Sequence, residues 1–196
     1  MMLLDLISGS LGGAAVRDIS RQLKTDEGTV NNALSSALPL LMGALEKNSS
    51  TSSGAESLLS ALDRDHDGSV LDDLGALLGQ GGSTSGDGIL RHLLGNRRPA
   101  VEAAVSRSSG MDMQSVGKLL AIVAPLIMGA LGKTKRERSL DPGGLSSLLG
   151  AEMRSVKKNQ SGDLGLLSLL DSDGDGDITD DVAKLGGSLL GKMFGK

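Results

Sequence analysis

"VNNALSSALPLLMGAL", residues 30–45, returns 86 positions later as "VGKLLAIVAPLIMGAL", residues 116–131. The same offset holds upstream without a gap, where residues 4–26 meet residues 90–112. A repeat of this length and fidelity predicts a tandem duplication of one helical unit. Within the longer match, the identical positions of the first copy are Val30, Leu34, Pro39, Leu40, Met42, Gly43, Ala44 and Leu45.

The composition favours helices over strands. Phe194 is the only aromatic residue among 196, so Leu, Ala, Ile, Val and Met must fill the core, and Met42 and Met128 are expected there. Strands prefer aromatic and β-branched residues, whereas this aliphatic set suits helices. Four of the 29 glycines follow a pair of leucines, at 77–79, 93–95, 148–150 and 189–191, and these are interpreted as helix ends. The predicted fold class is all-α.

The two predicted repeats cover residues 1–82 and 87–196. Aspartate-rich stretches close each repeat, but they align at an offset of 108 instead of 86. The second repeat has therefore gained an insertion at about 132–160, which includes "KTKRERSLDPGG". Its polar and turn-forming composition predicts a solvated linker.

Local signals mark several helices within the repeats. Residues 14–23 place Ala15, Ile19 and Leu23 on one face, which is amphipathic spacing. Thr25 or Asp26 is expected to cap the following helix, and Asp112 is expected to do so in the second copy. Proline cannot donate to the helical hydrogen-bond ladder, so Pro39 and Pro125 predict a kink or a break.

The aspartate-rich stretches are "DRDHDGSVLDDL", residues 63–74, and "DSDGDGDITDDV", residues 171–182. A calcium loop of the EF-hand type needs oxygen ligands at positions 1, 3 and 5, glycine at 6, a main-chain carbonyl at 7 and a carboxylate near 12. Both stretches match the first five requirements and place Leu74 or Val182 at position 12. The predicted ligands are Asp63, Asp65, Asp67, Ser69, Asp73, Asp171, Asp173, Asp175, Asp177 and Asp181.

Two Ca²⁺ sites follow from this pattern, with Asp73 and Asp181 favoured as the closing ligands. Asp72 and Asp180, one position earlier, are the alternative. Mg²⁺ fits less well because it demands compact octahedral geometry. The competing interpretation is a pair of acidic turns that cap helices, because Asp and Gly are ordinary turn residues.

Other function classes find little support in the sequence. The net charge of −4 argues against nucleic-acid binding, and the basic cluster of residues 133–138 is assigned to the linker. His66 and His92 have no Ser or Cys partner at an informative spacing, so no enzyme is predicted. The uncharged apolar stretch at 119–132 has 14 residues, fewer than a membrane span needs, and the first residues lack a basic signal-peptide region. We therefore expect a cytoplasmic protein.

Three segments together resemble a known family: "LLDLISGSLGG", the duplicated "APLIMGAL" type of segment and "LLSALDRDHDGSVLDDLGALLG". They are similar to the YidB-like family of bacterial proteins of unknown function, over nearly the whole chain. The resemblance implies an all-helical, homeodomain-like core without an assigned chemistry. The calcium ligands come from the loops of this sequence and not from the family.

The functional expectation is a calcium-binding helical protein in which Ca²⁺ organises the helices, as a structural fastener or a weak sensor. The alternative is a scaffold or self-assembly module, with a protein partner or a second copy bound through the apolar helices. In that case the aspartate loops would be incidental.

Overall fold

A computed structural model describes residues 3–65, 71 and 83–159 of the chain. These residues are helical apart from short connections and contain no strand, which confirms the all-α class for the described part. The chain divides into two units, 1–153 and 154–196, and the packing described below is that of the first. The helices are α1 (Leu3–Ser10), α2 (Gly13–Leu23), α3 (Glu27–Ser49), α4 (Ser52–Asp65), α6 (Ser83–Leu94), the short 3₁₀ helix η2 (Gly95–Arg97), α7 (Arg98–Ser109), α8 (Met113–Arg138) and α9 (Pro142–Asn159).

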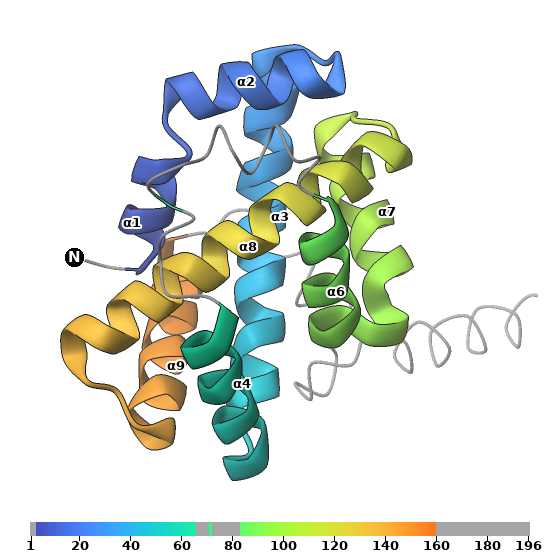
Figure 1. Ribbon diagram of the computed structural model, residues 1–196. Helices are drawn as coiled ribbons and strands as arrows, with labels where there is room; N and C mark the ends of the chain where they lie inside the picture. Colours follow the sequence, from blue (N-terminus) through green and yellow to red (C-terminus); the bar gives the residue numbers. More distant parts are fainter. Residues whose placement is uncertain (1–2, 66–70, 72–82, 160–196) are drawn as a thin grey trace, which may run out of the picture. The chain divides into compact units, whose positions relative to one another are not determined.

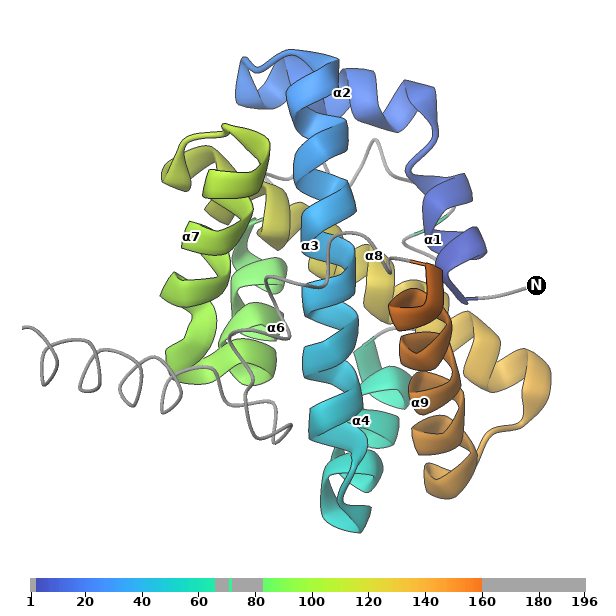
Figure 2. The ribbon, with the colours of Figure 1, turned by 180° about the vertical axis from the view of Figure 1, so that it is seen from behind.

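Helix α8 is the centre of the core (Figure 1). Its residues 119–132 are all buried, so it is covered on every side. Helices α6, α1, α7 and α4 pack against it, and α6 makes the most extensive contact. The second long helix, α3, packs mainly on α7, α4 and α2 (Figure 2). Helices of the two predicted repeats therefore pack on each other and share one core.

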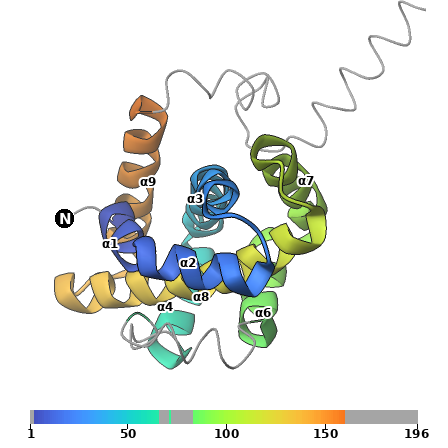
Figure 3. The ribbon, with the colours of Figure 1, turned by 90° about the horizontal axis from the view of Figure 1, so that it is seen from above.

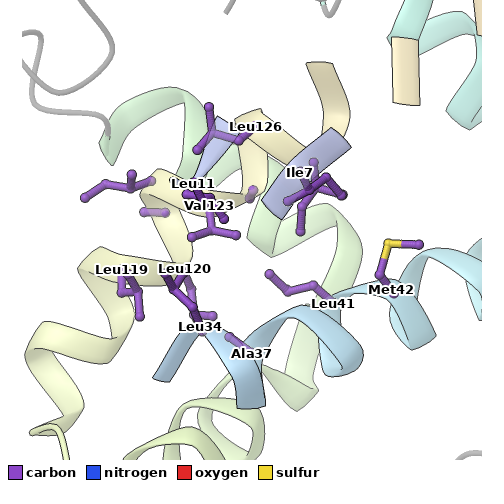
Figure 4. Packing of buried hydrophobic residues seen from close by; sticks show 14 of the residues in the cluster. Ile7, Leu11, Leu34, Ala37, Leu41, Met42, Leu119, Leu120, Val123 and Leu126 are labelled. Atoms are coloured by element: carbon purple, nitrogen blue, oxygen red, sulfur yellow. The ribbon is translucent and has the colours of Figure 1, made fainter. Parts of the chain in front are cut away.

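Helices α3 and α8 meet α1 in the interior. Figure 4 shows Leu34 and Leu41 of α3 directed toward Leu120 and Val123 of α8. Ile7 of α1 lies close to this cluster and is completely buried. The hydrophobic core of the described residues consists of aliphatic side chains and methionines, as the composition predicts. Met42 and Met128 belong to it, which confirms the expectation for both residues.

The duplicated stretches bury corresponding positions. Val30, Leu34, Leu41 and Leu45 are buried in α3, and so are the residues 86 positions later in α8. The predicted amphipathic helix is also confirmed, because α2 buries its apolar face of Ala15, Val16, Ile19 and Leu23. Helical spacing in the sequence therefore predicted these buried faces correctly.

The turns that precede α3 and α8 have the same structure. Lys24 and Gly110 both adopt left-handed backbone conformations, with φ of 54° and 75°. The Asp26 carboxylate accepts from the Thr29 N–H at 2.8 Å, and the Asp112 carboxylate accepts from the N–H three residues later at 3.0 Å. These are the expected caps, and Asp26 rather than Thr25 fills the position in the first copy.

Neither proline breaks its helix. Pro39 lies inside α3 and Pro125 lies inside α8, and both helices continue beyond them. A helical proline leaves the carbonyl four residues earlier without its usual donor. In α3 that carbonyl belongs to Ser35, an exposed residue that water can reach. In α8 it belongs to the buried Ala121.

The expected linker at 132–160 is helical as far as it is described. Helix α8 continues to Arg138, and after a short turn α9 begins at Pro142. The Asp141 carboxylate accepts from the Gly144 N–H at 2.7 Å, so the "DPGG" of the sequence starts a helix instead of forming a loop. Leu145 and Leu149 of α9 are fully buried. The linker interpretation was wrong because proline and glycine suit the first turn of a helix as well as a loop.

The Leu-Leu-Gly signal has two outcomes in the described residues. At 93–95 it marks a helix end, since α6 stops at Leu94 and Gly95 has a positive φ of 52°. At 148–150 it does not, because α9 continues through Gly150 to Asn159. The instances at 77–79 and 189–191 lie outside the described residues.

Helix α8 is long and apolar enough to cross a membrane by length and composition alone. However, 83% of its most apolar window is buried inside the protein. Its hydrophobicity is thus used in packing against the surrounding helices. Figure 3 shows α8 running beneath α3, with α4 and α6 on its other side.

Candidate metal centre

The first aspartate loop begins at the end of α4. Asp63 lies in the last turn of this helix, with 53% of its side chain exposed, and Asp65 is the final helical residue. The remaining predicted ligands lie outside the described residues: Asp67, Ser69, Asp73, Asp171, Asp173, Asp175, Asp177 and Asp181. The alternative closing residues Asp72 and Asp180 do so as well. Within the described part, no three His, Cys, Asp or Glu side chains come together as a metal site.

Asp63 is held by a lysine from another helix. Its carboxylate forms an ion pair with the Lys135 ammonium group near the end of α8. The Lys135 side chain is only 17% exposed, so most of this lysine is buried. Lys135 was assigned to a solvated linker from the sequence, and only the helical course of 132–138 brings it to Asp63. The first loop position therefore has a cationic neighbour.

The exit side of the first loop is anchored at one described residue. Leu71 is half-buried and packs against the hydrophobic core. Loop position 1 is thus fixed by α4, and loop position 9 is fixed by an apolar contact. These two points are what the described residues contribute to the first candidate centre.

A second charged cluster links α6 to α7. The Arg98 guanidinium donates to Glu102 through Nε and to Asp87 through Nη2, both at 2.7 Å. The hydrogen bond to Glu102, followed by that to Asp87, raises the pKa of Arg98 against the opposing effect of burial. The cluster holds two helices together. Sequence spacing could suggest only the pair four residues apart in α7.

Glu152 is the only charged residue that is deeply buried in the described part of the first unit. It is 5% exposed, and its Oε1 accepts the Leu3 N–H at 2.8 Å, at the start of α1. Its Oε2 is buried and has no hydrogen-bond partner among the described residues. Sequence reasoning missed it because the segment was assigned to a linker. The signal was present, because Leu145, Leu149 and Glu152 share the apolar face of one helix.

His92 lies on the exposed surface of α6, as expected from the sequence. His66 lies outside the described residues. No nucleophile–base pair is formed by the side chains described above.

The fold and these clusters define an all-α protein in which buried aliphatic residues dominate and charged side chains mainly connect helices. The chain belongs to the DUF937 family of bacterial proteins of unknown function, whose family model matches residues 5–134. The match confirms the family resemblance, but it ends within α8 instead of covering nearly the whole chain. No curated protein and no solved structure matches the sequence.

Proposed function

We propose that the protein binds two Ca²⁺ ions through residues 63–74 and 171–182, and that the metal fastens helices. The spacing of aspartate, glycine and carbonyl positions in two related loops supports this function. The single structural observation that carries it is the position of Asp63 and Asp65 at the end of α4. A helix that leads directly into the first ligands is the arrangement that a helix–loop–helix calcium site requires. A non-enzymatic role is part of the proposal.

We also propose that the chain consists of two copies of one helical unit, each closed by such a loop. The matching caps of α3 and α8, the matching left-handed residues before them and their corresponding buried positions support this origin. In this view α9 lies in the insertion of the second copy.

Calorimetric titration with Ca²⁺ tests the function. The wild-type chain should bind two equivalents, and Asp65→Ala and Asp173→Ala should each lose one. Asp18→Asn is the control, since it removes a carboxylate that is exposed on α2 and outside both loops. No binding at millimolar Ca²⁺ would reject the proposal, and two full equivalents in either loop variant would reject the ligand assignment.

The closing ligand can be tested separately. Asp73→Asn should weaken the first site much more than Asp72→Asn, because the two substitutions remove the same charge but only one removes the proposed ligand. Equal losses would show that long-range charge, and not coordination, explains the pair.

A thermal melt with a hydrophobic dye distinguishes a fastener from a sensor. Ca²⁺ at one hundred times its dissociation constant should stabilise each filled site by about 2.7 kcal/mol. A fastener raises the midpoint without new dye binding. Strong dye fluorescence on adding Ca²⁺ would instead indicate a sensor that exposes apolar surface.

A second candidate function, protein–protein binding, is favoured by an open groove of about 1370 Å³ that residues of α4 and α6 line. Calcium dependence separates the two functions, because a binding module with incidental aspartate loops would retain its partner in the presence of a chelator.

A further inference from the structure

Asp63, the first residue of the first aspartate loop, is in contact with a cationic group of the chain itself. The ammonium group of Lys135, in the last turn of α8, forms an ion pair with the Oδ1 atom of Asp63. In a calcium loop of the EF-hand type, the carboxylate at position 1 supplies an oxygen to the ion. The ammonium group and a Ca²⁺ ion would therefore compete for the same carboxylate.

The two partners of this ion pair differ in exposure. The Lys135 side chain is 17% exposed, whereas the Asp63 side chain is 53% exposed. A mostly buried ammonium group stays beside its carboxylate because a buried charge without a partner is strongly unfavourable. The Asp63 side chain, in contrast, is open enough for an ion from solution to reach it. The pair is thus stable on its own and accessible to exchange.

The main chain around Lys135 is fixed, so only the side chain can move in such an exchange. The Lys135 carbonyl accepts the Leu140 N–H at 3.0 Å, where α8 ends, and Leu140 packs against the hydrophobic core. Lysine carries a compact charge on a flexible stem of four carbons. Its ammonium group can therefore turn toward water while α8 keeps its position.

A second lysine on the same helix provides an internal comparison. Lys133 lies two residues before Lys135 and carries the same charge. Residues two positions apart are separated by about 200° around a helix, so the two side chains do not share a face. Long-range charge acts through both lysines, whereas direct competition at Asp63 belongs to Lys135.

We propose that the Lys135 ammonium group is a built-in competitor for Ca²⁺ at the first loop, and that metal binding displaces it from Asp63. This inference rests on the proposed Ca²⁺ function and adds how its first site is regulated. The competition lowers the affinity of the first loop for Ca²⁺. Filling the loop also exchanges an ion pair between α4 and α8 for a metal ligand bond, so metal binding and release of Lys135 are one event.

The test uses the full-length chain with Asp173→Ala, which removes binding by the second loop, and calorimetric titration with calcium chloride. In this background Lys135→Gln should bind Ca²⁺ about threefold more tightly, because the competing charge is gone. Lys135→Arg should bind no more tightly, since it keeps a cation at this position. Lys133→Gln is the matched control and should change the affinity little.

A second measurement needs no substitution at Lys135. An amine-reactive acetylating reagent labels exposed lysines in the otherwise wild-type chain, and mass spectrometry of the digested protein gives the labelling rate of each site. Saturating Ca²⁺ should raise the labelling rate of Lys135 severalfold, because the ammonium group leaves its partly buried ion pair. The labelling rate of Lys133 should stay the same.

The outcomes separate this inference from the function on which it rests. An unchanged affinity in Lys135→Gln, an equal increase in Lys133→Gln, or a labelling rate of Lys135 that does not respond to Ca²⁺ would each overturn the competition and leave Ca²⁺ binding intact. The same holds if the second loop binds Ca²⁺ in Asp65→Ala but the first loop binds none, with or without Lys135→Gln. Absence of binding by both loops would reject the Ca²⁺ function, and the competition with it.

Discussion

Replacing Gly86 with alanine should destabilise the protein strongly, whereas the same change two residues later should not. Gly86 lies in the first turns of α6, directly against α8. A Cβ atom at this position would stand 1.8 Å from the Ala121 carbonyl oxygen and 2.6 Å from its carbon. Real Cβ contacts are not shorter than 3.0 Å, so the two helices would have to separate by about 1.2 Å, the difference between 3.0 and 1.8.

The obstacle is main chain, so no side chain can rotate away to relieve it. Overpacking of this kind lowers the free energy of unfolding by about 1–3 kcal/mol. The higher helix propensity of alanine raises it by up to about 1 kcal/mol. We therefore expect Gly86→Ala to lower the free energy of unfolding by about 2 kcal/mol. For a chain of this size, the melting midpoint should fall by about 4–8 °C.

Gly88→Ala is the matched control, because it lies in the same helix and its added Cβ meets nothing within 4 Å. It should be neutral or stabilise the protein by up to about 1 kcal/mol. Urea unfolding followed by circular dichroism measures both variants, with an unchanged denaturant slope as the check on two-state behaviour. If Gly86→Ala were as stable as Gly88→Ala, the close packing of α6 on the Ala121 carbonyl would be refuted.

Three further predictions address the charged residues. Glu152→Gln keeps an acceptor for the buried N–H at the start of α1 and should be tolerated. Glu152→Ala should lower the free energy of unfolding, measured in urea, by about 1–3 kcal/mol because that donor loses its partner. Equal stabilities of the two variants would refute the role of the hydrogen bond. If Ca²⁺ binds the first loop, Lys135→Gln should tighten that site about two- to fivefold in calorimetry by removing the ion pair with Asp63, while Lys135→Arg should not. Hydrogen bonds lower the pKa of the caps Asp26 and Asp112, and those from the Thr29 and Ser115 side chains have the largest effect. Both caps therefore stabilise the protein above the unfolded pKa of 3.8, and this stabilisation is lost as the pH falls through the folded pKa. When the pH is lowered in an acid titration, the melting midpoint of a variant with Asn at both positions should fall less steeply than that of the wild type.

Local features of the fold could be predicted from the sequence. The caps Asp26 and Asp112 depend on a hydrogen bond to a residue three positions away, and the buried face of α2 depends on spacing within one helix. Such relations join residues that are close together in the sequence, so a short stretch of sequence is enough to predict them. The failure at 132–160 was also local, because an Asp-Pro-Gly-Gly stretch is compatible with both a loop and a helix start. Only the burial of Leu145 and Leu149 decides between them.

The features that join distant elements could not be predicted in this way. The ion pair between Asp63 and Lys135 and the hydrogen bond from Leu3 to Glu152 connect residues 72 and 149 positions apart. For the candidate centre, sequence spacing supplied the ligand types, but the lysine beside Asp63 depends on how α8 crosses α4. A metal affinity argued from the loop alone would therefore omit one of its main electrostatic contributions.

The two prolines show how one repeated stretch of sequence can have different consequences in two environments. Pro39 frees the carbonyl of exposed Ser35, which water can satisfy, so nothing in the surrounding packing has to change. Pro125 frees the carbonyl of buried Ala121, and there the neighbouring helix approaches through Gly86, whose lack of a side chain lets the main chain come within contact distance. The close packing of α6 on α8 thus depends on a glycine in α6, which is why we expect a substitution to cost more at Gly86 than at either proline.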